Sequence, residues 1–108
     1  MFKKKLSTLY DGTTIYVIDG NQVRDLYDED FLKGGHGYCY SYIPKNEIWI
    51  EKDVIYDNEP ELLAHEIFEY FQMKNLGLTY EKAHSHAESI ELALRQINII
   101  AEKINKKF

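Results

Sequence analysis

The sequence predicts an α+β domain in which a small antiparallel sheet of two hairpins packs on a C-terminal antiparallel pair of helices. Two observations carry this prediction. In the first half of the chain, short runs of β-branched and aromatic residues are separated by turn residues, as in strands. The second half changes to the three- and four-residue spacing of amphipathic helices. A length of 108 residues suits a single domain, residues 1–108, with one modest core.

The four predicted strands are residues 6–10, 13–18, 38–43 and 47–51. Asp11-Gly12 joins the first two, because Asp-Gly is a strong signal for a two-residue hairpin turn. A Pro-Lys-Asn segment joins the last two. Between the hairpins, residues 20–33 fit either a short helix or an irregular crossover. Gly34-Gly35-His36-Gly37 follows, and we expect it to interrupt any regular element.

Two helices are predicted after the strands. Asn58-Glu59-Pro60-Glu61 resembles a capping box, so the first helix should begin near residue 59, with Asn58 as its cap. Gly77 should end this helix in a left-handed conformation. Thr79 caps a second helix that runs to about residue 103. Because the connection is so short, the two helices should form an antiparallel hairpin.

The second helix carries an apolar stripe with alternating spacings of four and three. Its members are Ala83, Ala87, Ile90, Leu94, Ile97, Ala101, Ile104 and Phe108. We interpret it as one continuous buried face of a core helix. A dimer seam is the alternative, because the same spacing is typical of coiled coils, so the chain is expected to be a monomer or a homodimer.

Composition and charge exclude several functions. A net charge of -5 argues against nucleic-acid binding as the main function. No apolar run is long enough to span a membrane, and the N-terminal residues lack the apolar core of a signal peptide. The single cysteine, Cys39, fits a reducing compartment, and we interpret it as structural. These features together predict a cytoplasmic protein.

The stretch His65-Glu66-Ile67-Phe68-Glu69 points to metal chemistry. A helix advances about 100° per residue, so His65 and Glu69 share one face and can bind one ion. The stretch differs from the zinc-protease pattern H-E-x-x-H only at its last position. Glu66 points about 60° away from Glu69, which suits a general base that takes a proton from an attacking water.

The second helix should complete this site. Counting residues outward from the turn places Glu91 opposite His65, with His84 on the same stripe. The candidate metal ligands are therefore His65, Glu69, His84 and Glu91. Because His84 and Glu91 lie about 10.5 Å apart along the axis, one can bind the ion while the other orients it from outside, or Glu88 is the third ligand. Three protein ligands predict zinc, and a carboxylate ligand also suits manganese or iron.

His36 is the second candidate catalytic residue. It is flanked by glycines, which let a backbone approach a substrate closely and which expose N–H donors.

These segments resemble two groups of proteins. Leu62-Leu63-Ala64-His65-Glu66 on a helix that follows a strand resembles the active-site helix of small zincin-like proteins. A wider set of segments resembles a group of uncharacterised phage and prokaryotic proteins over about two-thirds of the chain. These segments are Gly34-Gly35-His36, residues 43–50, His65-Glu66-x-x-Glu69, residues 73–77, Tyr80 and Ala83-His84-x-x-Ala87-x-x-x-Glu91. The resemblance implies that His65, Glu69, His84 and Glu91 belong to one site, with no particular substrate.

Three functions follow from these patterns. The first is a small zincin-like metal-dependent hydrolase of unknown substrate. The second is a carboxylate-bridged two-metal site that uses Glu81-x-x-His84 together with Glu66 or Glu69. The third is a non-enzymatic interaction module with a vestigial or structural site. Its contact surface would be Tyr38, Tyr40 and Tyr42, which share one face if residues 38–43 form a strand.

Overall fold

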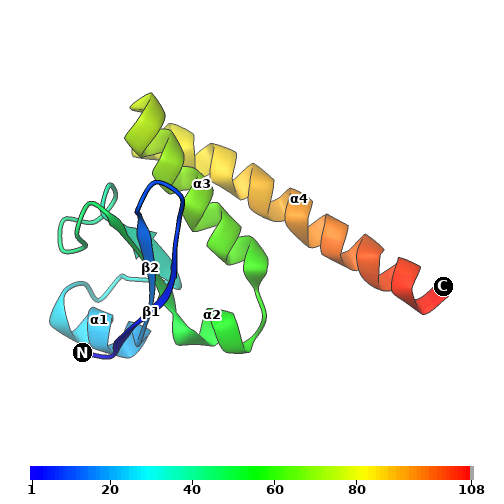
Figure 1. Ribbon diagram of the computed structural model, residues 1–108, viewed down its shortest axis with the longest axis horizontal. Coiled ribbons are helices and arrows are strands. Elements are labelled where there is room, and N and C mark those ends of the chain that lie inside the picture. Colours follow the sequence, from blue (N-terminus) through cyan, green and yellow to red (C-terminus); the bar gives the residue numbers. More distant parts are fainter. Residues whose placement is uncertain (108) are drawn as a thin grey trace.

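A four-stranded mixed sheet and a C-terminal pair of helices make up the computed structural model, which describes residues 1–107 (Figure 1). The elements in chain order are β1 (Lys3–Thr8), β2 (Thr14–Ile18), α1 (Gly20–Leu26), β3 (Gly34–His36), β4 (Glu47–Glu51), α2 (Lys52–Tyr56), α3 (Pro60–Leu76) and α4 (Tyr80–Lys107). The α+β class and the helical pair agree with the prediction. None of the helices described in residues 1–107 has the length and apolar character needed to cross a membrane.

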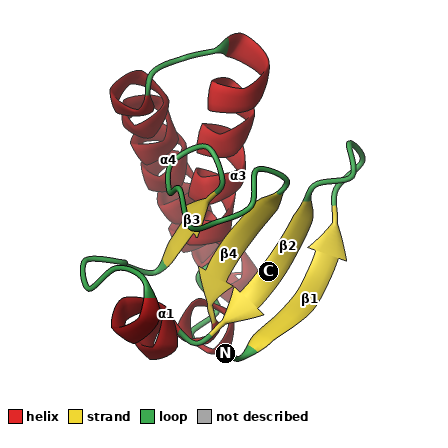
Figure 2. Cartoon of the chain, turned by 90° about the vertical axis from the view of Figure 1, so that its left-hand side faces the viewer, coloured by secondary structure: helices red, strands yellow, loops and turns green. Residues whose placement is uncertain are grey.

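The sheet differs from the two antiparallel hairpins that the sequence predicts. Its order is β1-β2-β4-β3, and β2 pairs with β4 in parallel, so that Thr14 lies opposite Glu47 (Figure 2). Only the outer pairs, β1 with β2 and β3 with β4, are antiparallel. β1 ends at Thr8, so the first connection is longer than two residues, and Gly12 takes its left-handed turn position with a φ of 91°.

Residues 38–43, predicted as a strand, form turns. The backbone N–H groups of Cys39 and Tyr40 both donate to the carbonyl of His36, which curls the chain away from the sheet. The glycine segment that we expected to interrupt regular structure instead supplies β3. A Cβ atom on Gly35 would lie 2.5 Å from the Tyr40 ring, so the absence of a side chain is what lets β3 sit this close.

The two faces of the sheet carry separate core clusters. On one face, α3 covers Ile15, Ile48 and Ile50 with Leu62, Leu63, Ile67 and Phe71. On the other face, α1 and the following loop cover Ile18 and Trp49 with Val23 and Phe31. The predicted tyrosine face does not form, because Tyr38 packs against the first cluster while Tyr40 and Tyr42 pack against the second.

The helical pair forms as predicted, with different details at its ends. α3 begins at Pro60 behind Glu59, and Asn58 does not cap it but takes a φ of 53°. Gly77 is the left-handed cap that ends α3. The Thr79 hydroxyl accepts the Lys82 N–H at the start of α4. α1 settles the open assignment of residues 20–33, and the short helix α2 has no counterpart in the prediction.

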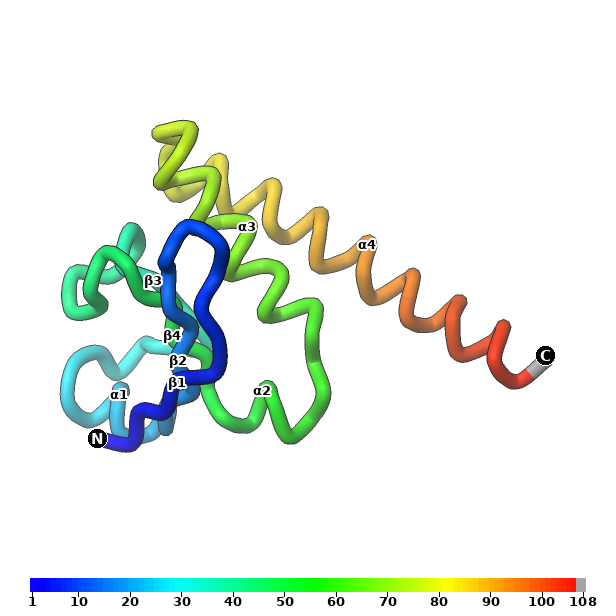
Figure 3. The backbone as a smooth tube through the Cα atoms, viewed as in Figure 1, coloured from blue at the N-terminus to red at the C-terminus, as the bar shows by residue number. Residues whose placement is uncertain are grey.

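The apolar stripe of α4 is buried only where α3 covers it, so the expectation of one continuous buried stripe is wrong. Ala83 and Ala87 are fully buried, whereas Ile97 and Ile104 are 56% and 51% exposed. The cause is length: α3 has 17 residues and α4 has 28, and the second half of α4 extends past α3 (Figure 3). Phe108, the last predicted member of the stripe, lies outside the described residues.

Candidate metal centre

Two helices place the central side chains of the site. On α3, His65 and Glu69 stand one turn apart and are both buried. Because Ile67 and Phe71 hold the other side of α3 against the sheet, the stripe with His65 and Glu69 faces α4. His84 projects from the first turns of α4 toward both of them.

Three ligand atoms of these residues form a small triangle. His65 Nε2 lies 3.2 Å from Glu69 Oε2 and 3.3 Å from His84 Nδ1. His84 Nδ1 lies 2.8 Å from the same Glu69 oxygen. Ligand atoms around a tetrahedral zinc ion stand about 3.4 Å apart, because each is about 2.1 Å from the ion. The distances in the triangle are close to this spacing and slightly shorter, so the three side chains can hold a metal ion.

Each histidine of the triangle has a carboxylate behind it. His65 Nδ1 lies 2.9 Å from Glu91 Oε1, and His84 Nε2 lies 3.1 Å from Glu88 Oε1. A carboxylate accepts hydrogen bonds, so in each ring the outer nitrogen donates and the inner nitrogen can present its lone pair to the triangle. Arg95 holds Glu91 in turn, with Nη2 2.6 Å from Glu91 Oε2. This is the support that metal-binding histidines have in proteins.

His36 supports the third corner of the triangle. The Tyr38 backbone N–H donates to His36 Nδ1 at 3.2 Å, which fixes the proton of the neutral ring on Nε2. His36 Nε2 then donates to Glu69 Oε1 at 2.8 Å. Tyr70 packs against the ring edge to face, with ring centroids 5.5 Å apart. One oxygen of Glu69 is thereby held by the sheet, and the other is turned to the triangle.

A second group of metal-ligand atoms consists of His36, Glu66 and Glu69. It shares Glu69 with the triangle, as a two-metal site would. However, His36 Nε2 could bind an ion only if the ring proton moved to Nδ1, where it would face the Tyr38 N–H. The hydrogen bonds of His36 therefore favour the triangle as the site and His36 as its support.

Two pKa shifts of opposite sign describe the charge at the site. Burial alone would raise the pKa of Glu69, but hydrogen bonds from His36, His65 and His84 lower it to about 2. The hydrogen bond to Glu69 raises the pKa of His65, against the effect of burial. The carboxylate thus stays ionised, and His65 gains a proton more easily than a free imidazole. The site favours a positive charge beside Glu69, which protons or a cation can supply.

A cavity of about 300 Å³ opens beside the triangle, and Glu66 lies on its wall. Burial first, and then the charge of Glu69, raise the pKa of Glu66 to about 8. β3 allows this placement, because a Cβ atom on Gly34 would lie 3.0 Å from Glu66 Cγ. A nearby cation would lower the pKa of Glu66 again, since it favours the ionised form.

The cavity also contains two residues to which the sequence analysis assigned no role at the site. Tyr80 stacks on His84 with ring centroids 5.1 Å apart and lines the cavity. Its position four residues before His84 was the available signal, because such residues are neighbours on a helix. Cys39, interpreted as structural, also lines the cavity. Burial first, together with the charges of Glu69 and Glu66, raises the pKa of its thiol to about 12, so the thiol stays protonated.

The structure sorts the predicted site residues into distinct places. His65, Glu69 and His84 form the triangle, while Glu91 and Glu88 lie behind the histidines rather than in it. His36, predicted as catalytic, stands behind Glu69 and off the cavity wall, and Glu66 is on the wall.

Two further candidate side chains, Glu81 and His86, lie outside this arrangement. Glu81, the partner of His84 in the two-metal hypothesis, is exposed and belongs to neither group of ligand atoms found in residues 1–107. His86, two residues after His84, bonds only to Gln72 among the described residues.

Comparison of the chain with models of protein families, with curated proteins and with solved structures gives no match.

Proposed function

We propose that this chain is a small metal-dependent hydrolase whose ion is held by His65, Glu69 and His84. The observation that carries the proposal is the triangle of ligand atoms, 2.8 to 3.3 Å apart, beside a cavity that also contains a carboxylate. Two imidazoles and one carboxylate are a ligand set of catalytic zinc sites, and open positions remain for a substrate. The same set also suits iron(II), so zinc is the first expectation and iron or manganese the alternatives.

The H-E-x-x-E stretch supports a zincin-like role for Glu66. Glu66 follows the ligand His65 directly, as the general base does in H-E-x-x-H helices, and it reaches the cavity rather than the triangle. The carboxylate of Glu69 takes the position of the second histidine, and His84 on α4 supplies the second imidazole.

The ion and the chain have separate tasks in this proposal. A bound ion supplies Lewis acidity, which polarises a carbonyl and makes an attacking water more acidic. Ionised Glu66 accepts a proton from that water at its carboxylate and gives it to the leaving group. Glu91, Glu88 and His36 keep the three ligands in place.

Elemental analysis of protein purified without a histidine tag tests the metal site. We expect about one transition-metal ion per chain, a loss of metal in His84→Ala, and full metal content in His86→Ala. The second variant is a matched control, because His86 lies on the same helix but bonds to Gln72 outside the triangle. A folded protein that stays without metal after incubation with excess zinc, iron(II) or manganese would contradict the proposal.

Hydrolysis is tested separately with Glu66→Gln. This variant should keep its metal and lose about 10²- to 10⁴-fold in the rate of hydrolysis, which is the usual contribution of a general base. The measurement is cleavage of a library of fluorogenic peptides and esters by the metal-loaded protein. If the loaded wild type cleaves none of them, or if Glu66→Gln cleaves equally well, the metal site stands and the hydrolase proposal fails.

A further inference from the structure

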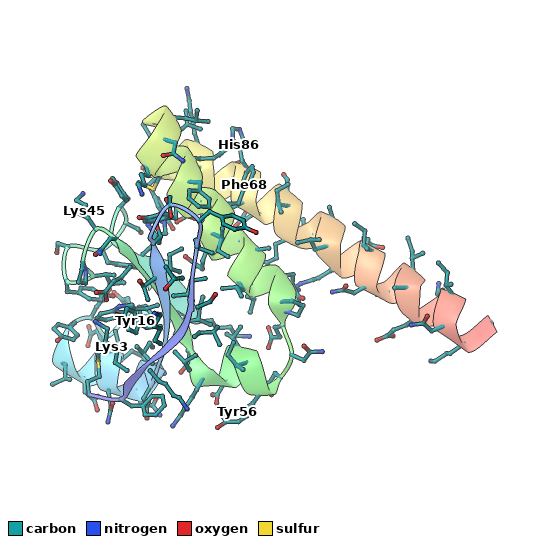
Figure 4. The ribbon with its side chains drawn as sticks, viewed as in Figure 1. Lys3, Tyr16, Lys45, Tyr56, Phe68 and His86 are labelled. Atoms are coloured by element: carbon teal, nitrogen blue, oxygen red, sulfur yellow. The ribbon has the colours of Figure 1, made fainter. Side chains whose placement is uncertain are left out.

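Beyond Arg95, α4 packs against no other element in the described part of the chain. Arg95 Nε lies 3.7 Å from Glu61 Oε1 in the first turn of α3, so α3 covers α4 only up to about Arg95. Residues 96–107 continue past this point for about 18 Å. Figure 4 shows the side chains of residues 96–106 standing apart from those that crowd the rest of the molecule. We call residues 96–107 the overhang.

The overhang repeats the pattern that α3 covers in the first half of α4. Ile97, Ala101 and Ile104 continue the four-and-three spacing of Ala83 and Ala87 without a break. Such spacing keeps apolar residues along one seam between paired helices. Ile100 adjoins the seam and is also exposed. Helical stability in water comes mostly from packing of an apolar face, so a partner on this seam would stabilise the overhang.

We propose that the overhang of a second copy covers this seam, so that the protein is a homodimer joined by antiparallel α4 helices. An antiparallel pair centred between Ile100 and Ala101 sets these two residues opposite each other and sets Ile97 opposite Ile104 of the second copy. A large side chain then faces a small one at the centre. The α4 helix of the second copy then lies on the seam where α3 ends, and it runs in the same direction as α3.

Charge selects the second copy and its direction. The overhang carries three lysines, Lys103, Lys106 and Lys107, against one glutamate, in a chain whose net charge is -5. The start of α3 is acidic, with Asp57 exposed and with Glu59 and Glu61 already paired to one cation each. A carboxylate accepts more than one donor, so these groups can take a lysine of the other copy. The antiparallel pair brings the lysine end of each copy to this acidic corner, whereas a parallel pair would set lysines against lysines.

A groove lies at the corner where these charges would meet. It has a volume of about 460 Å³ and is lined by Pro60 and Glu61 at the start of α3 and by Asn98 and Asn105 on the overhang. Its position between the acidic start of α3 and the overhang leaves room for the end of the second α4. The inference is independent of the metal site and goes beyond the proposed hydrolase.

Sedimentation velocity and light scattering over a series of concentrations test the dimer. Ile97→Glu and Ile104→Glu should each raise the dissociation constant at least about 100-fold, because every dimer then buries two unpaired carboxylates. Leu92→Glu is the matched control. Leu92 is 62% exposed against 56% for Ile97, but it precedes the overhang and points about 140° away from Ile97 around the helix, so its substitution should leave the dimer intact. Circular dichroism spectra and urea unfolding midpoints like those of the wild type show that all three variants are folded.

The opposite results would overturn the inference. They are a wild type that stays monomeric at every concentration, or a dimer that survives both Ile97→Glu and Ile104→Glu. A monomer that sediments with anionic phospholipid vesicles only while Ile97 is intact would assign the seam to a membrane surface instead.

Single cysteines in a Cys39→Ser background test the direction. Oxidation should link the cysteines of two Ala101→Cys chains to each other. In a mixture of Ile97→Cys and Ile104→Cys chains, it should link one variant to the other. Ile104→Cys alone should not link to itself, and if it does, the antiparallel arrangement is wrong.

Discussion

At the scale of single residues, Glu69 is the centre of the molecule's polar interior. One of its carboxylate oxygens accepts a hydrogen bond from His36, and the other lies within hydrogen-bond distance of both His65 and His84. These three histidines come from β3, α3 and α4. A carboxylate without such donors would be costly to bury, so the histidines and Glu69 depend on one another. A metal ion in the triangle would take the place of the protons that His65 and His84 direct at one of these oxygens, while His36 keeps the other.

Loss of His36 should weaken metal binding without removing a ligand. We expect His36→Ala to lower the affinity for zinc by about 10- to 100-fold, which is the usual cost of losing a group that orients a ligand. His36→Gln should restore part of this loss, because its amide N–H can donate to Glu69 in place of Nε2. Competition with a chromophoric zinc chelator measures the affinity. If both variants bind zinc like the wild type, Glu69 does not need His36.

Acid should remove the contribution of Glu69 to stability. Its pKa is lowered from 4.5 to about 2 on folding, so the ionised form stabilises the fold at every pH above about 4.5. This contribution, on the order of 2 kcal/mol, is lost as the pH falls from there toward 2. Glu69→Gln mimics the protonated acid and lacks it at all pH values. Urea unfolding in EDTA should therefore show a stability gap between wild type and variant near neutral pH that closes in acid. A gap that stays constant would contradict the shifted pKa.

Local helix geometry explains which site residues the sequence could predict. His65 and Glu69 share a helix face, and the short turn after α3 fixes which residues of α4 lie opposite. This geometry predicts Glu91 opposite His65, and the two side chains lie 2.9 Å apart. The role of His36 could not be found in this way. It depends on the Tyr38 N–H and on the position of β3 beside α3, and neither follows from neighbouring residues.

At the scale of elements, the helices were predictable and β3 was not. α3 and α4 carry their own start and stop signals, such as Pro60 and Gly77. β3 consists of Gly34, Gly35 and His36, a composition that disfavours strands in general. It forms because β4 offers a free edge and because bulkier residues would collide with Glu66 and the Tyr40 ring.

The turn between α3 and α4 offers a test of how much the helical pair depends on one residue. Gly77 has a φ of 65°, and nothing lies within 4 Å of a Cβ atom added there. Gly77→Ala should therefore cost about 1 kcal/mol of unfolding free energy through backbone strain alone. Gly77→Asn should cost less, because Asn tolerates this conformation. Urea denaturation measures both, and an alanine variant as stable as the wild type would show that the turn relaxes at no cost.

At the scale of the whole molecule, the class of fold was predictable and the strand order was not. Alternating and helical patterns identify which segments are strands or helices, but they do not state which strands pair. Strands close in sequence usually pair with each other, and on this basis the last two predicted strands were joined in a hairpin. In the structure, β4 instead lies between β2 and β3. Burial of Ile48 and Ile50 under α3 specifies this central position.

The pairing of β3 with the edge of β4 has a consequence for how the protein folds. His65 and His84 are only 19 positions apart, and α3 and α4 can gather them with Glu69 by closing a short loop. His36 is 33 positions from Glu69 and reaches it only when β3 has joined the sheet. The ligands are therefore expected to assemble early and their support late. A chain that folds in this order would first bind metal weakly, and completion of the sheet would then raise its affinity for the ion.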